Sequence, residues 1–468
     1  MSVMSALPHP LWSAAIARPH QAFVNDLSYA ELAERAARRA AQLEAQKPAW
    51  RGARLGLSGR YDELWVEWAM SLSWLGATVA PMGVNATAQE RAQRRERLSL
   101  EAVISLDERG VARDEEGAEL VGAGEESEGR AAAQLEPAPW AWERAQFALM
   151  TSGTTGAPKP IELSARALTM SALGSMVRLG HLPSDRWLAC LPLHHVGGLS
   201  ILTRALIQQT SLRFVEPKGE ALAEALCSGQ YQLCSLTPTL LSDALDHLER
   251  LSDERRAGLE SLRVLLIGGA RTSAELWERA RALGLPLRLT WGMSEAASQV
   301  CTQVEQAPPG GALPPLPFQR VELSDEGCLV VSGPTTERGR FETRDLGHID
   351  ERGWVSVQGR LDELIISGGI NVHPREIEER LNAHPSLADA AVLGVDDPRW
   401  GQALHAYLRL KEGAERPSDE ELKRWCRAQL SHYKTPKTFH WRDALPRDPL
   451  GKLQRHRLNP SHGSEGSS

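Results

Sequence analysis

Two kinds of hydrophobic pattern alternate along the chain, one with the period of a helix and one formed by short apolar runs. Residues 27–43 (LSYAELAERAARRAAQL) place apolar side chains such as Leu32 at the spacing of one helix face. Ser28 stands where a helix-capping hydroxyl is expected. A second, more apolar helix is expected over residues 63–76, followed by a short buried strand over residues 78–81.

From Ala145 onward, short apolar runs alternate with helical stretches. Apolar runs bounded by turn residues predict buried strands, and their alternation with helices indicates an α/β fold with a largely parallel sheet. Such sheets bind ligands in the loops beyond the carboxyl ends of their strands, so we expect the chemistry there. The expected strands are 147–150, 187–191, 212–215, 234–236, 264–267 and 287–291, and the expected helices are 165–178, 221–227 and 273–283.

The pattern changes again near Gly359, where roughly 100 residues of mixed helix and strand suit a small separate domain. The expected fold class is therefore α/β, with a large multi-subdomain N-terminal domain that has mostly parallel sheets and a small α+β C-terminal domain joined by a hinge. We place the large domain at 1–361, the small mobile domain at 362–458 and a disordered polar tail at 459–468. In the small domain we expect an initial strand, then helix 374–382, strands 390–395 and 404–410, and helix 418–430.

Composition and charge narrow the function classes. The 468 residues include 53 Lys and Arg against 60 Asp and Glu, a net charge of −7, which gives no basic excess for nucleic acid or an anionic membrane. Nine acidic side chains in residues 107–130 predict a solvated, irregular stretch. No signal peptide or membrane-spanning segment is evident, and the six cysteines form no CxxC pair, so we expect a cytoplasmic protein without a zinc or redox motif.

The strongest chemical signal is TSGTTGAPK at residues 151–159, directly after an apolar run. Its glycines allow a tight turn in which successive N–H groups converge on an anion, and its hydroxyl groups add further donors. Lys159 adds a positive charge, so the segment suits a triphosphate. It is not a Walker A loop, because Lys159 follows Pro158 and the glycine spacing differs, which counts against a P-loop phosphotransferase.

This segment resembles the phosphate loop [ST]SGT[ST]GxPK of the adenylate-forming superfamily, which contains acyl-CoA synthetases, adenylation domains and luciferases. Five further motifs of the family follow in order, and the resemblance spans roughly residues 22 to 458. It implies that ATP or AMP is bound by Thr151, Ser152, Gly153, Thr154, Thr155, Gly156, Lys159, Gly269, Ala270, Trp291, Gly292, Met293, Ser294, Asp345 and Arg360.

The segment LPLHHVGG at residues 191–198 resembles the motif whose histidine lies at the acid-binding pocket, which assigns that place to His195. His194 stands where the family usually has Phe. A His-His pair can also indicate a metal site, but no third ligand follows at a plausible spacing.

The segment WGMSE at residues 291–295 resembles the family motif YGxTE. The resemblance implies that Trp291 stacks on adenine, that Ser294 contacts the α-phosphate and that Glu295 holds Mg²⁺. Trp in place of Tyr keeps a wide π-face, and Ser in place of Thr keeps a hydroxyl group.

The last third of the chain carries the remaining motifs, beginning with those that concern the ribose and the hinge. Thr343-Arg344-Asp345 stands where the family has TGD, so by resemblance Asp345 binds the ribose hydroxyls and Arg360 lies near ribose and phosphate. Asp362 falls at the hinge position between the two domains.

The segment beginning at Ile366 resembles the small-domain loop that assists thioester formation, which assigns Gly368 and Gly369 to CoA. Residues 446–452 resemble the terminal PxxxxGK motif, and Lys452 would be the lysine that promotes adenylation.

The acid and its acceptor are inferred from the same resemblance. Only a short polar tail follows Lys452, so we expect free CoA and not a tethered carrier arm as the acceptor. HHVGGLSILTR and WGMSEAASQ look most like the 2-succinylbenzoate–CoA ligases of menaquinone biosynthesis. Arg204, nine residues after His195, is either a partner for a second substrate carboxylate or a surface helix arginine. The residues expected to contact the acid are His195, Arg204, Gly268, Gly269 and Ser298.

The resemblance therefore predicts an acid–thiol ligase that forms an acyl-adenylate from ATP and transfers the acyl group to CoA. Lys452, Glu295 and His195 are the expected catalytic residues, and Mg²⁺ is the expected metal, held by Glu295. The expected partners are a small-molecule acid, ATP and CoA, without nucleic acid or membrane insertion, and a homodimer stays open. The alternatives are a ligase for another aryl or acyl acid of the benzoate type, and a non-catalytic nucleotide-binding member of the fold.

Overall fold

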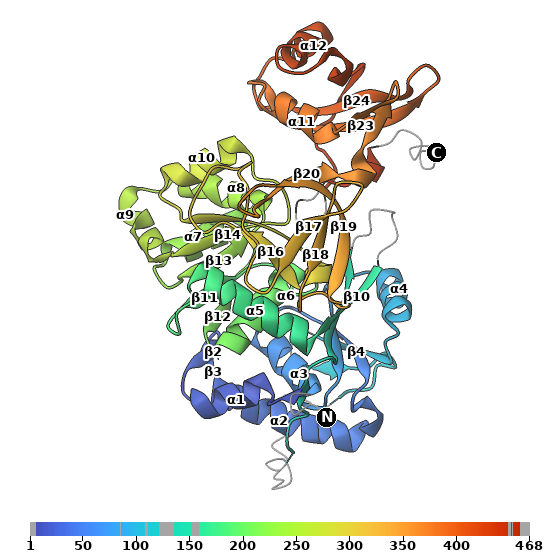
Figure 1. Ribbon diagram of the computed structural model, residues 1–468. Helices are drawn as coiled ribbons and strands as arrows, with labels where there is room; N and C mark the ends of the chain where they lie inside the picture. The colour runs from blue at the N-terminus through green and yellow to red at the C-terminus, as the bar shows by residue number, and fades with distance from the viewer. Residues whose placement is uncertain are drawn as a thin grey trace. The chain divides into compact units, whose positions relative to one another are not determined.

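The structure is a computed structural model that describes residues 6–84, 86–107, 111–120, 135–151, 159–447, 451 and 453–458 (Figure 1). The chain forms two units. The first consists of Met1–Glu322, Val330–Phe341 and Ile349–Val355, and the second consists of Leu323–Leu329, Glu342–His348 and Ser356–Ser468. The expected boundary after residue 361 and the mobility of the small domain stay predictions.

An eight-stranded sheet is the larger of the two main sheets in the first unit. Its six inner strands all run parallel, and an antiparallel strand closes each edge, as the strand–helix alternation of the sequence predicts. In spatial order its strands are β16 Ser298–Thr302, β15 Leu287–Met293, β14 Val264–Ile267, β13 Leu233–Leu236, β11 Arg186–Ala189, β12 Ser211–Phe214, β2 Ala22–Val24 and β3 Leu27–Ser28.

A six-stranded sheet forms the other main layer of this unit. Its four central strands are parallel and its two edge strands are antiparallel. Pro160 is accommodated because its strand lies at the sheet edge, where a missing N–H breaks no inner ladder. In spatial order the strands are β10 Lys159–Ser164, β9 Ala145–Thr151, β5 Thr78–Met82, β4 Arg54–Ser58, β6 Ala102–Leu106 and β7 Ala112–Arg113; β1 Ala6–Leu7 and β8 Trp140–Ala141 form a separate pair.

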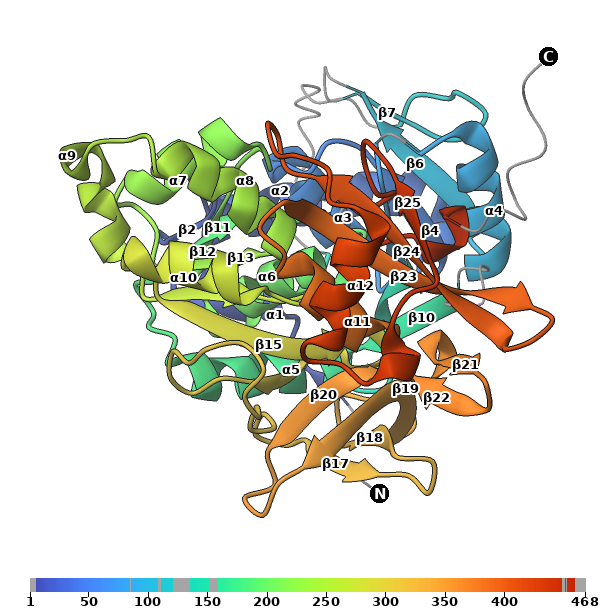
Figure 2. The same ribbon diagram turned by 90° about the horizontal axis from the view of Figure 1, so that it is seen from above.

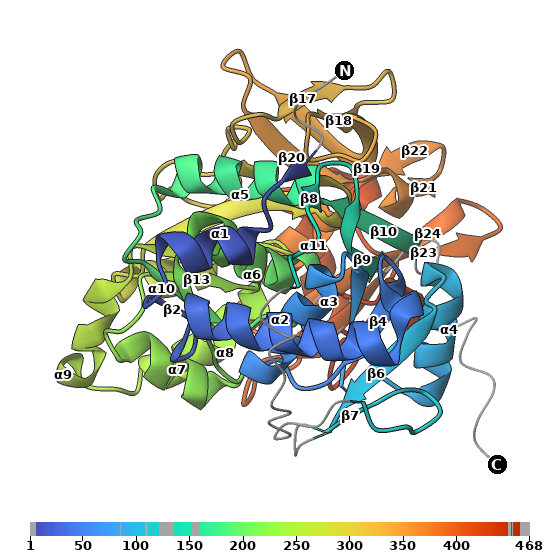
Figure 3. The same ribbon diagram turned by 90° about the horizontal axis from the view of Figure 1, so that it is seen from below.

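Helices cover these sheets, and several begin at a side-chain cap. Ser28 caps α2 through a capping box with Glu31, which confirms the expected start of that helix. Figure 3 shows α2 beside α1. The helices of this unit are α1 Pro10–Ala17, α2 Tyr29–Gln46, α3 Glu63–Trp74, α4 Ala88–Leu98, α5 Ala165–Leu179, α6 Val196–Gln208, α7 Gly219–Cys227, α8 Pro238–Leu248, α9 Asp253–Arg256 and α10 Ala274–Ala282; the 3₁₀ turns are η1 Pro48–Trp50, η3 Ala257–Ser261 and η4 Ser294–Ala296.

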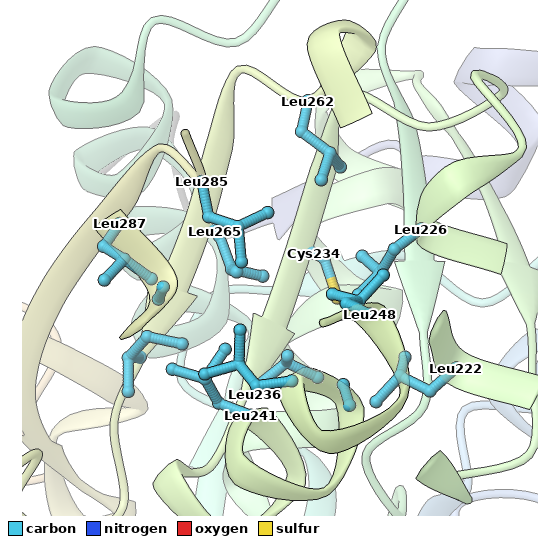
Figure 4. Close-up of a cluster of buried hydrophobic side chains, with 14 of the residues drawn as sticks. Leu222, Leu226, Cys234, Leu236, Leu241, Leu248, Leu262, Leu265, Leu285 and Leu287 are labelled. Carbon is cyan, nitrogen blue, oxygen red and sulfur yellow. The ribbon is translucent and has the colours of Figure 1, made fainter. Parts of the chain in front are cut away.

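A leucine-rich core lies between α7, α8 and α10 and one face of the large sheet (Figure 4). Leu188 on β11 belongs to this core. Its neighbour Trp187 points to the opposite face, because side chains alternate along a strand, and there it approaches Arg204 of α6. The sheet is therefore covered on both faces, and its loops at the strand ends stand on a buried support.

A four-stranded sheet with the order β17-β18-β19-β20 lies in the segment where the chain passes between the units. In the C-terminal unit, α11 and α12 pack against β23 and β24 (Figure 2). The bounds of these elements are β17 Arg320–Leu323, β18 Cys328–Ser332, β19 Arg340–Ile349, β20 Val355–Arg360, η5 Leu361–Glu363, β21 Ile365–Ser367, β22 Ile370–Val372, α11 Pro374–Asn382, β23 Leu387–Asp397, β24 Gly401–Leu410, α12 Asp419–Arg427, η6 His432–Lys434, β25 Thr438–Trp441 and η7 Arg455–Arg457.

All the strands and helices expected from Ala145 onward are present within a few residues of their expected bounds. The expectation of an irregular stretch over residues 107–130 is wrong at β7, which pairs with β6. The expected disordered tail at 459–468 lies outside the described residues. Within the described ranges, no helix is both long enough and apolar enough to cross a membrane.

Candidate active site

The ends of three strands of the large sheet carry about half of the expected site residues of the first unit. β11 leads to His195, β14 leads to Gly268 and Gly269, and β15 ends in the segment 291–295. Because β11, β13, β14 and β15 run parallel, their carboxyl ends lie along one edge of the sheet. This is the edge where ligands of such sheets bind.

The two ends of the TSGTTGAPK segment lie opposite each other. Thr151 ends β9 and pairs with Lys159, the first residue of β10, in the antiparallel ladder. The Thr151 hydroxyl donates to the carbonyl oxygen of Lys159 at 3.3 Å. The side chain of Lys159 is exposed, so its charge is available to an anion. The expected phosphate-binding residues Ser152, Gly153, Thr154, Thr155 and Gly156 lie outside the described residues.

The WGMSE segment ends β15 in a tight approach to β16. A Cβ atom on Gly292 would lie 1.8 Å from the carbonyl oxygen of Ser298, so a side chain at this position cannot fit. Ala297 and Ser298 both have positive φ, 52° and 103°, a conformation that non-glycine residues rarely adopt. The Ser171 hydroxyl donates to the Ala297 carbonyl oxygen at 2.7 Å and holds this turn. Trp291, Met293, Ser294 and Glu295 are all partly exposed at this strand end.

Arg204 is buried, with a side chain that is among the largest fully buried ones. Its guanidinium donates to the Ser298 hydroxyl at 3.2 Å, and that hydroxyl also lies 3.2 Å from the Ser200 hydroxyl. Ser200 and Arg204 are four residues apart on α6 and therefore share a helix face. The surface alternative for Arg204 is wrong, and the structure brings two expected acid-site residues, Arg204 and Ser298, together.

Among the described residues, no counter-charge accompanies the Arg204 guanidinium. No described carboxylate forms an ion pair with Arg204, and its Nε has no hydrogen-bond partner. Burial lowers the pKa of the Arg204 guanidinium to about 9. A buried cation of this kind favours an anionic ligand, because a carboxylate would supply the missing charge and acceptors.

His194 and His195 lie side by side at the start of α6, with ring centroids 4.3 Å apart. The Nδ1 atom of His194 lies 2.7 Å from the hydroxyl of Tyr61, which also donates to the Met82 carbonyl oxygen at 3.2 Å. Burial lowers the pKa of His194 to about 3, with smaller contributions from His195 and Arg94, so His194 is neutral at physiological pH. A neutral imidazole held by Tyr61 therefore replaces the usual Phe of this motif.

In the C-terminal unit, Arg360 joins two of the expected site residues. Its guanidinium donates to Asp345 at 2.9 Å and to both carboxylate oxygens of Asp362 at 2.9 and 3.2 Å. Burial lowers the pKa of Arg360, but Asp362 and Asp345 outweigh it, so the pKa lies above its ordinary value. Thr343 donates to the Leu329 carbonyl oxygen at 2.7 Å and accepts from the Asp345 N–H at 3.0 Å, which orients the start of this cluster.

The other expected residues of this unit lie in two turns. Gly368 and Gly369 are exposed in the turn between β21 and β22, and the Gly368 N–H donates to the Trp400 carbonyl oxygen at 2.8 Å. Lys452 lies outside the described residues, although both its chain neighbours, Gly451 and Leu453, are described.

The chemistry of Glu295 fits a magnesium ion. Its carboxylate is partly exposed at the end of β15 and has no ion-pair partner among the described residues. Mg²⁺ typically takes one or two protein carboxylates together with phosphate oxygens and water. No group of three or more His, Cys, Asp or Glu side chains that could hold a metal occurs in the described part of the chain. The single carboxylate of Glu295 suits a metal ion that is shared with phosphates.

The sequence analysis did not identify two residues of the site, Tyr61 and Ser200. Tyr61 contacts His194 across 133 positions, and a single Tyr in an amphipathic context predicts nothing about so distant a partner. Ser200 could have been found from its four-residue spacing to Arg204 within one helix, had residues 196–208 been predicted as helical.

Comparisons with known proteins match most of the chain. The family model described as AMP-binding enzyme matches residues 11–340, and the model described as AMP-binding enzyme C-terminal domain matches residues 376–452. The 2-succinylbenzoate–CoA ligase of Bacillus velezensis is 34% identical over 415 residues, covering 82% of this chain and 83% of the relative. A Bacillus cereus protein of the same name is 37% identical over 346 residues, covering 68% and 70%.

Solved structures give the same relationship. The o-succinylbenzoate CoA synthetase of Bacillus subtilis in complex with its acyl-adenylate intermediate OSB-AMP superposes with a TM-score of 0.82 at 26% identity, covering 97% of this chain and 98% of that one. The same enzyme in complex with ATP and a magnesium ion gives a TM-score of 0.80 at 27% identity, covering 96% and 99%. The match over most of the chain, in sequence and in fold, shows that this protein belongs to the AMP-binding enzyme family.

Proposed function

We propose that the protein is an AMP-forming acid–thiol ligase that converts 2-succinylbenzoate into its CoA thioester, a reaction of menaquinone biosynthesis. The observation that carries the choice of acid is the buried charge of Arg204, which pairs with no carboxylate among the described residues. Relatives that are 34–37% identical carry the name of this activity. The acid, ATP and CoA are the proposed partners, and the cytoplasm, which supplies ATP and CoA, is the proposed compartment.

Arg204 gives the site a means of selecting a dicarboxylic acid. It lies on the helix that begins directly after His195, and it contacts Ser298, just beyond the WGMSE segment. A substrate with a second carboxylate would pair with Arg204 and with the serine hydroxyls beside it. A monocarboxylic acid such as benzoate would leave this charge buried and unpaired, which is costly.

In the proposed first half-reaction, a carboxylate oxygen of the acid attacks the α-phosphorus of ATP. The bond between the α-phosphorus and the bridging oxygen breaks, and pyrophosphate leaves. Both reactants are anions, so the catalytic task is to position them and to oppose their repulsion. Lys159 and Lys452 would supply positive charge, and His195 would line the acid pocket. No base is required, because the acid is already ionised at neutral pH.

Glu295 would hold Mg²⁺, and the bound metal neutralises phosphate charge during the displacement. Trp291 would stack on adenine, and Ser294 would donate to the α-phosphate. Asp345 would accept from the ribose hydroxyls, with Arg360 next to it. In the structure Arg360 already binds Asp345, so this carboxylate has a fixed position from which to accept.

In the proposed second half-reaction, the thiol of CoA attacks the acyl carbon of the adenylate. A carbon–sulfur bond forms, the bond from the acyl carbon to the AMP oxygen breaks, and AMP leaves with that oxygen. Gly368 and Gly369 would line the path of the pantetheine arm, and Asp362 would be the hinge about which the small domain turns between the two steps. Lys452 has no part in this second step.

The test is pyrophosphate release from ATP with a panel of acids, comprising 2-succinylbenzoate, benzoate, fatty acids and amino acids. We expect 2-succinylbenzoate to give the largest kcat/KM and to yield a CoA thioester. A preference for benzoate would instead support the aryl-acid alternative. If none of the acids elicits pyrophosphate release or exchange of pyrophosphate into ATP, the protein is a non-catalytic member of the fold.

A further inference from the structure

The contact between Tyr61 and His194 joins the two main sheets of the first unit. Tyr61 lies in the loop between β4 and α3, and Met82, whose carbonyl oxygen it binds, is the last residue of β5. β4 and β5 run parallel, so this loop and the end of β5 lie at one edge of the six-stranded sheet. His194 lies in the loop that follows β11 of the eight-stranded sheet. One hydroxyl group therefore connects the six-stranded sheet to the loop of the expected acid pocket.

The ring of His194 is enclosed on several sides. Its centroid lies 4.3 Å from that of His195 and 5.8 Å from that of Tyr61. A Cβ atom on Gly83 would lie 3.2 Å from the Cε1 atom of His194, so the backbone of Gly83 approaches the ring closely as well. Tyr61 in turn packs edge-on against Trp65, which is fully buried. Tyr61 therefore has a fixed position from which to hold the imidazole.

The two contacts of the Tyr61 hydroxyl determine which nitrogen of His194 carries the proton. The hydroxyl has one proton and a carbonyl oxygen can only accept, so the Tyr61 proton lies toward Met82, at 3.2 Å. For the 2.7 Å contact to be a hydrogen bond as well, Nδ1 of His194 must donate to the Tyr61 oxygen. Burial raises the pKa of Tyr61 and lowers the pKa of His194 to about 3, so both groups are neutral at physiological pH. The neutral ring is then the tautomer with its proton on Nδ1.

An imidazole at this position needs a polar partner, whereas a phenyl ring would not. A buried donor or acceptor without a partner is costly, so buried side-chain nitrogens are nearly always paired. The torsion that turns a histidine ring about its own axis has broad, roughly two-fold preferences, so packing alone does not choose one ring plane. Without the Tyr61 hydroxyl, the His194 ring would turn toward another acceptor. Such a turn would move the surface against which the His195 ring packs.

We propose that Tyr61 is a positioning residue of the acid pocket: its hydroxyl fixes the plane and the tautomer of the His194 ring, and that ring holds His195 in the orientation that binds the acid. This inference rests on the proposed function, in which His195 lines the acid pocket. Tyr61 itself need not touch the acid. The effect of losing its hydroxyl must therefore pass through His194 and His195, and it must disappear when either ring is replaced.

The experiment measures acid-dependent pyrophosphate release by a set of single and double variants. The variants are Tyr61→Phe, His194→Phe and His195→Ala, together with Tyr61→Phe in each of the two histidine backgrounds. Tyr407→Phe is the matched control, because the Tyr407 ring also stacks on an imidazole, that of His440 at 4.7 Å, while its buried hydroxyl has no hydrogen-bond partner among the described residues. Urea unfolding of each variant reports on folding.

We expect Tyr61→Phe to raise the KM for 2-succinylbenzoate by about 3- to 10-fold, the factor that corresponds to the loss of one neutral hydrogen bond. The kcat and the KM for ATP should stay as in the wild type, and Tyr407→Phe should change none of these constants. In the His194→Phe background, Tyr61→Phe should leave the KM for the acid near its wild-type value, because two apolar rings contain no nitrogen to leave unpaired. In the His195→Ala background, Tyr61→Phe should cause no further rise.

Nitrogen NMR of protein labelled at histidine gives a readout that does not depend on turnover. The resonances of His194 are identified by their loss in His194→Phe. The wild type should show this residue as a neutral imidazole with its proton on Nδ1, and Tyr61→Phe should no longer show that single form. A wild-type His194 with its proton on Nε2 would overturn the inference.

Three kinetic results would overturn the inference while the proposed function stands. These are a wild-type KM for the acid in Tyr61→Phe, a raised KM in the double variant with His194→Phe, and a further rise when Tyr61→Phe is added to His195→Ala. If Tyr61→Phe alone does not fold, the double variant with His194→Phe decides by the same criterion. If the wild type releases no pyrophosphate with any acid, the proposed function fails and the positioning role fails with it.

Discussion

Replacing Arg204 by methionine should make the protein more stable and less selective at the same time. Burial lowers the pKa of the Arg204 guanidinium from its ordinary value to about 9. At about 1.4 kcal/mol per pH unit, this displacement corresponds to a penalty of about 5 kcal/mol against the charged side chain. The penalty applies in full below pH 9, and therefore at neutral pH, because the folded protein must hold a charge that the unfolded chain exposes to water.

The substitution also removes favourable contacts of Arg204. One hydrogen bond to the Ser298 hydroxyl disappears, which costs about 1 kcal/mol, together with a cation–π contact to Trp187 of about 0.5–1 kcal/mol. Methionine fills a similar volume without a charge. We therefore expect the free energy of unfolding to rise by about 1–4 kcal/mol, as when buried charges are replaced by apolar side chains elsewhere.

The catalytic effect should have the opposite sign. A hydrogen bond to a charged group contributes about 1.5–3 kcal/mol, so the KM for 2-succinylbenzoate should rise by about 10- to 100-fold. The KM for benzoate should not rise, because benzoate has no second carboxylate to lose a partner. Urea unfolding at pH 7 and steady-state pyrophosphate release with both acids measure the two effects.

Arg178→Met is the matched control for this experiment. Arg178 lies on the neighbouring helix α5 and donates to three backbone carbonyl oxygens, of Thr302 at 2.7 Å, Pro314 at 3.3 Å and Pro315 at 2.8 Å. Its replacement should destabilise the protein without changing the ratio of KM values. Arg204 does not bind the acid if Arg204→Met is less stable than the wild type and keeps the wild-type ratio of the two KM values, because Arg204 would then be a structural arginine like Arg178.

Three further outcomes follow from the site. The KM for 2-succinylbenzoate should rise relative to that for benzoate as the pH rises through about 9, where the free enzyme loses the Arg204 charge; a ratio that is flat from pH 7 to 10 would contradict this assignment. As the pH falls from 6.5 to about 3, the wild type should lose stability at His194, because the unfolded chain binds a proton there and the buried imidazole does not. His194→Phe lacks this group, so its free energy of unfolding should fall less over the same range in urea unfolding. Parallel plots of unfolding free energy against pH for the two proteins would contradict this expectation. Gly292→Ala should destabilise the protein by about 3 kcal/mol or more, since its Cβ would meet the Ser298 carbonyl oxygen at 1.8 Å. Gly311→Ala should be near neutral, because its Cβ would make only an ordinary van der Waals contact, 3.8 Å from the Pro308 carbonyl oxygen; equal unfolding midpoints would rule out the close approach at Gly292.

The sequence predicts five strands of the large sheet, namely β11, β12, β13, β14 and β15, because each is a continuous apolar run whose burial does not depend on a particular distant partner. It does not predict β2, β3 and β16 of the same sheet. It misses β25, Thr438–Trp441, which is a strand because it pairs in parallel with β24. It also misses the helix α6, whose two glycines near its start disfavour a helix on propensity alone. In both cases tertiary contacts decide the conformation.

The candidate site divides in the same way. Motif spacing predicts which residues take part, including Arg204 and Ser298, but not that these two touch. Their contact joins positions 94 residues apart, and only the fold shows that Arg204 is buried and that no carboxylate of the described ranges pairs with it. The contact of Tyr61 with His194 is equally invisible in the sequence, because these residues lie 133 positions apart in loops of two different sheets.

The leucine core of Figure 4 has a consequence for how this fold can change over evolution. The helices α7, α8 and α10 pack on one face of the sheet, while the loops that follow β11, β14 and β15 stand at its edge, so the residues of these loops are separate from those of the leucine core. A loop can therefore exchange a side chain for one that suits another acid without opening a cavity beneath it. Such a separation lets one scaffold diversify into enzymes for many acids, and it makes the strand-end loops the natural place to redirect this enzyme by design.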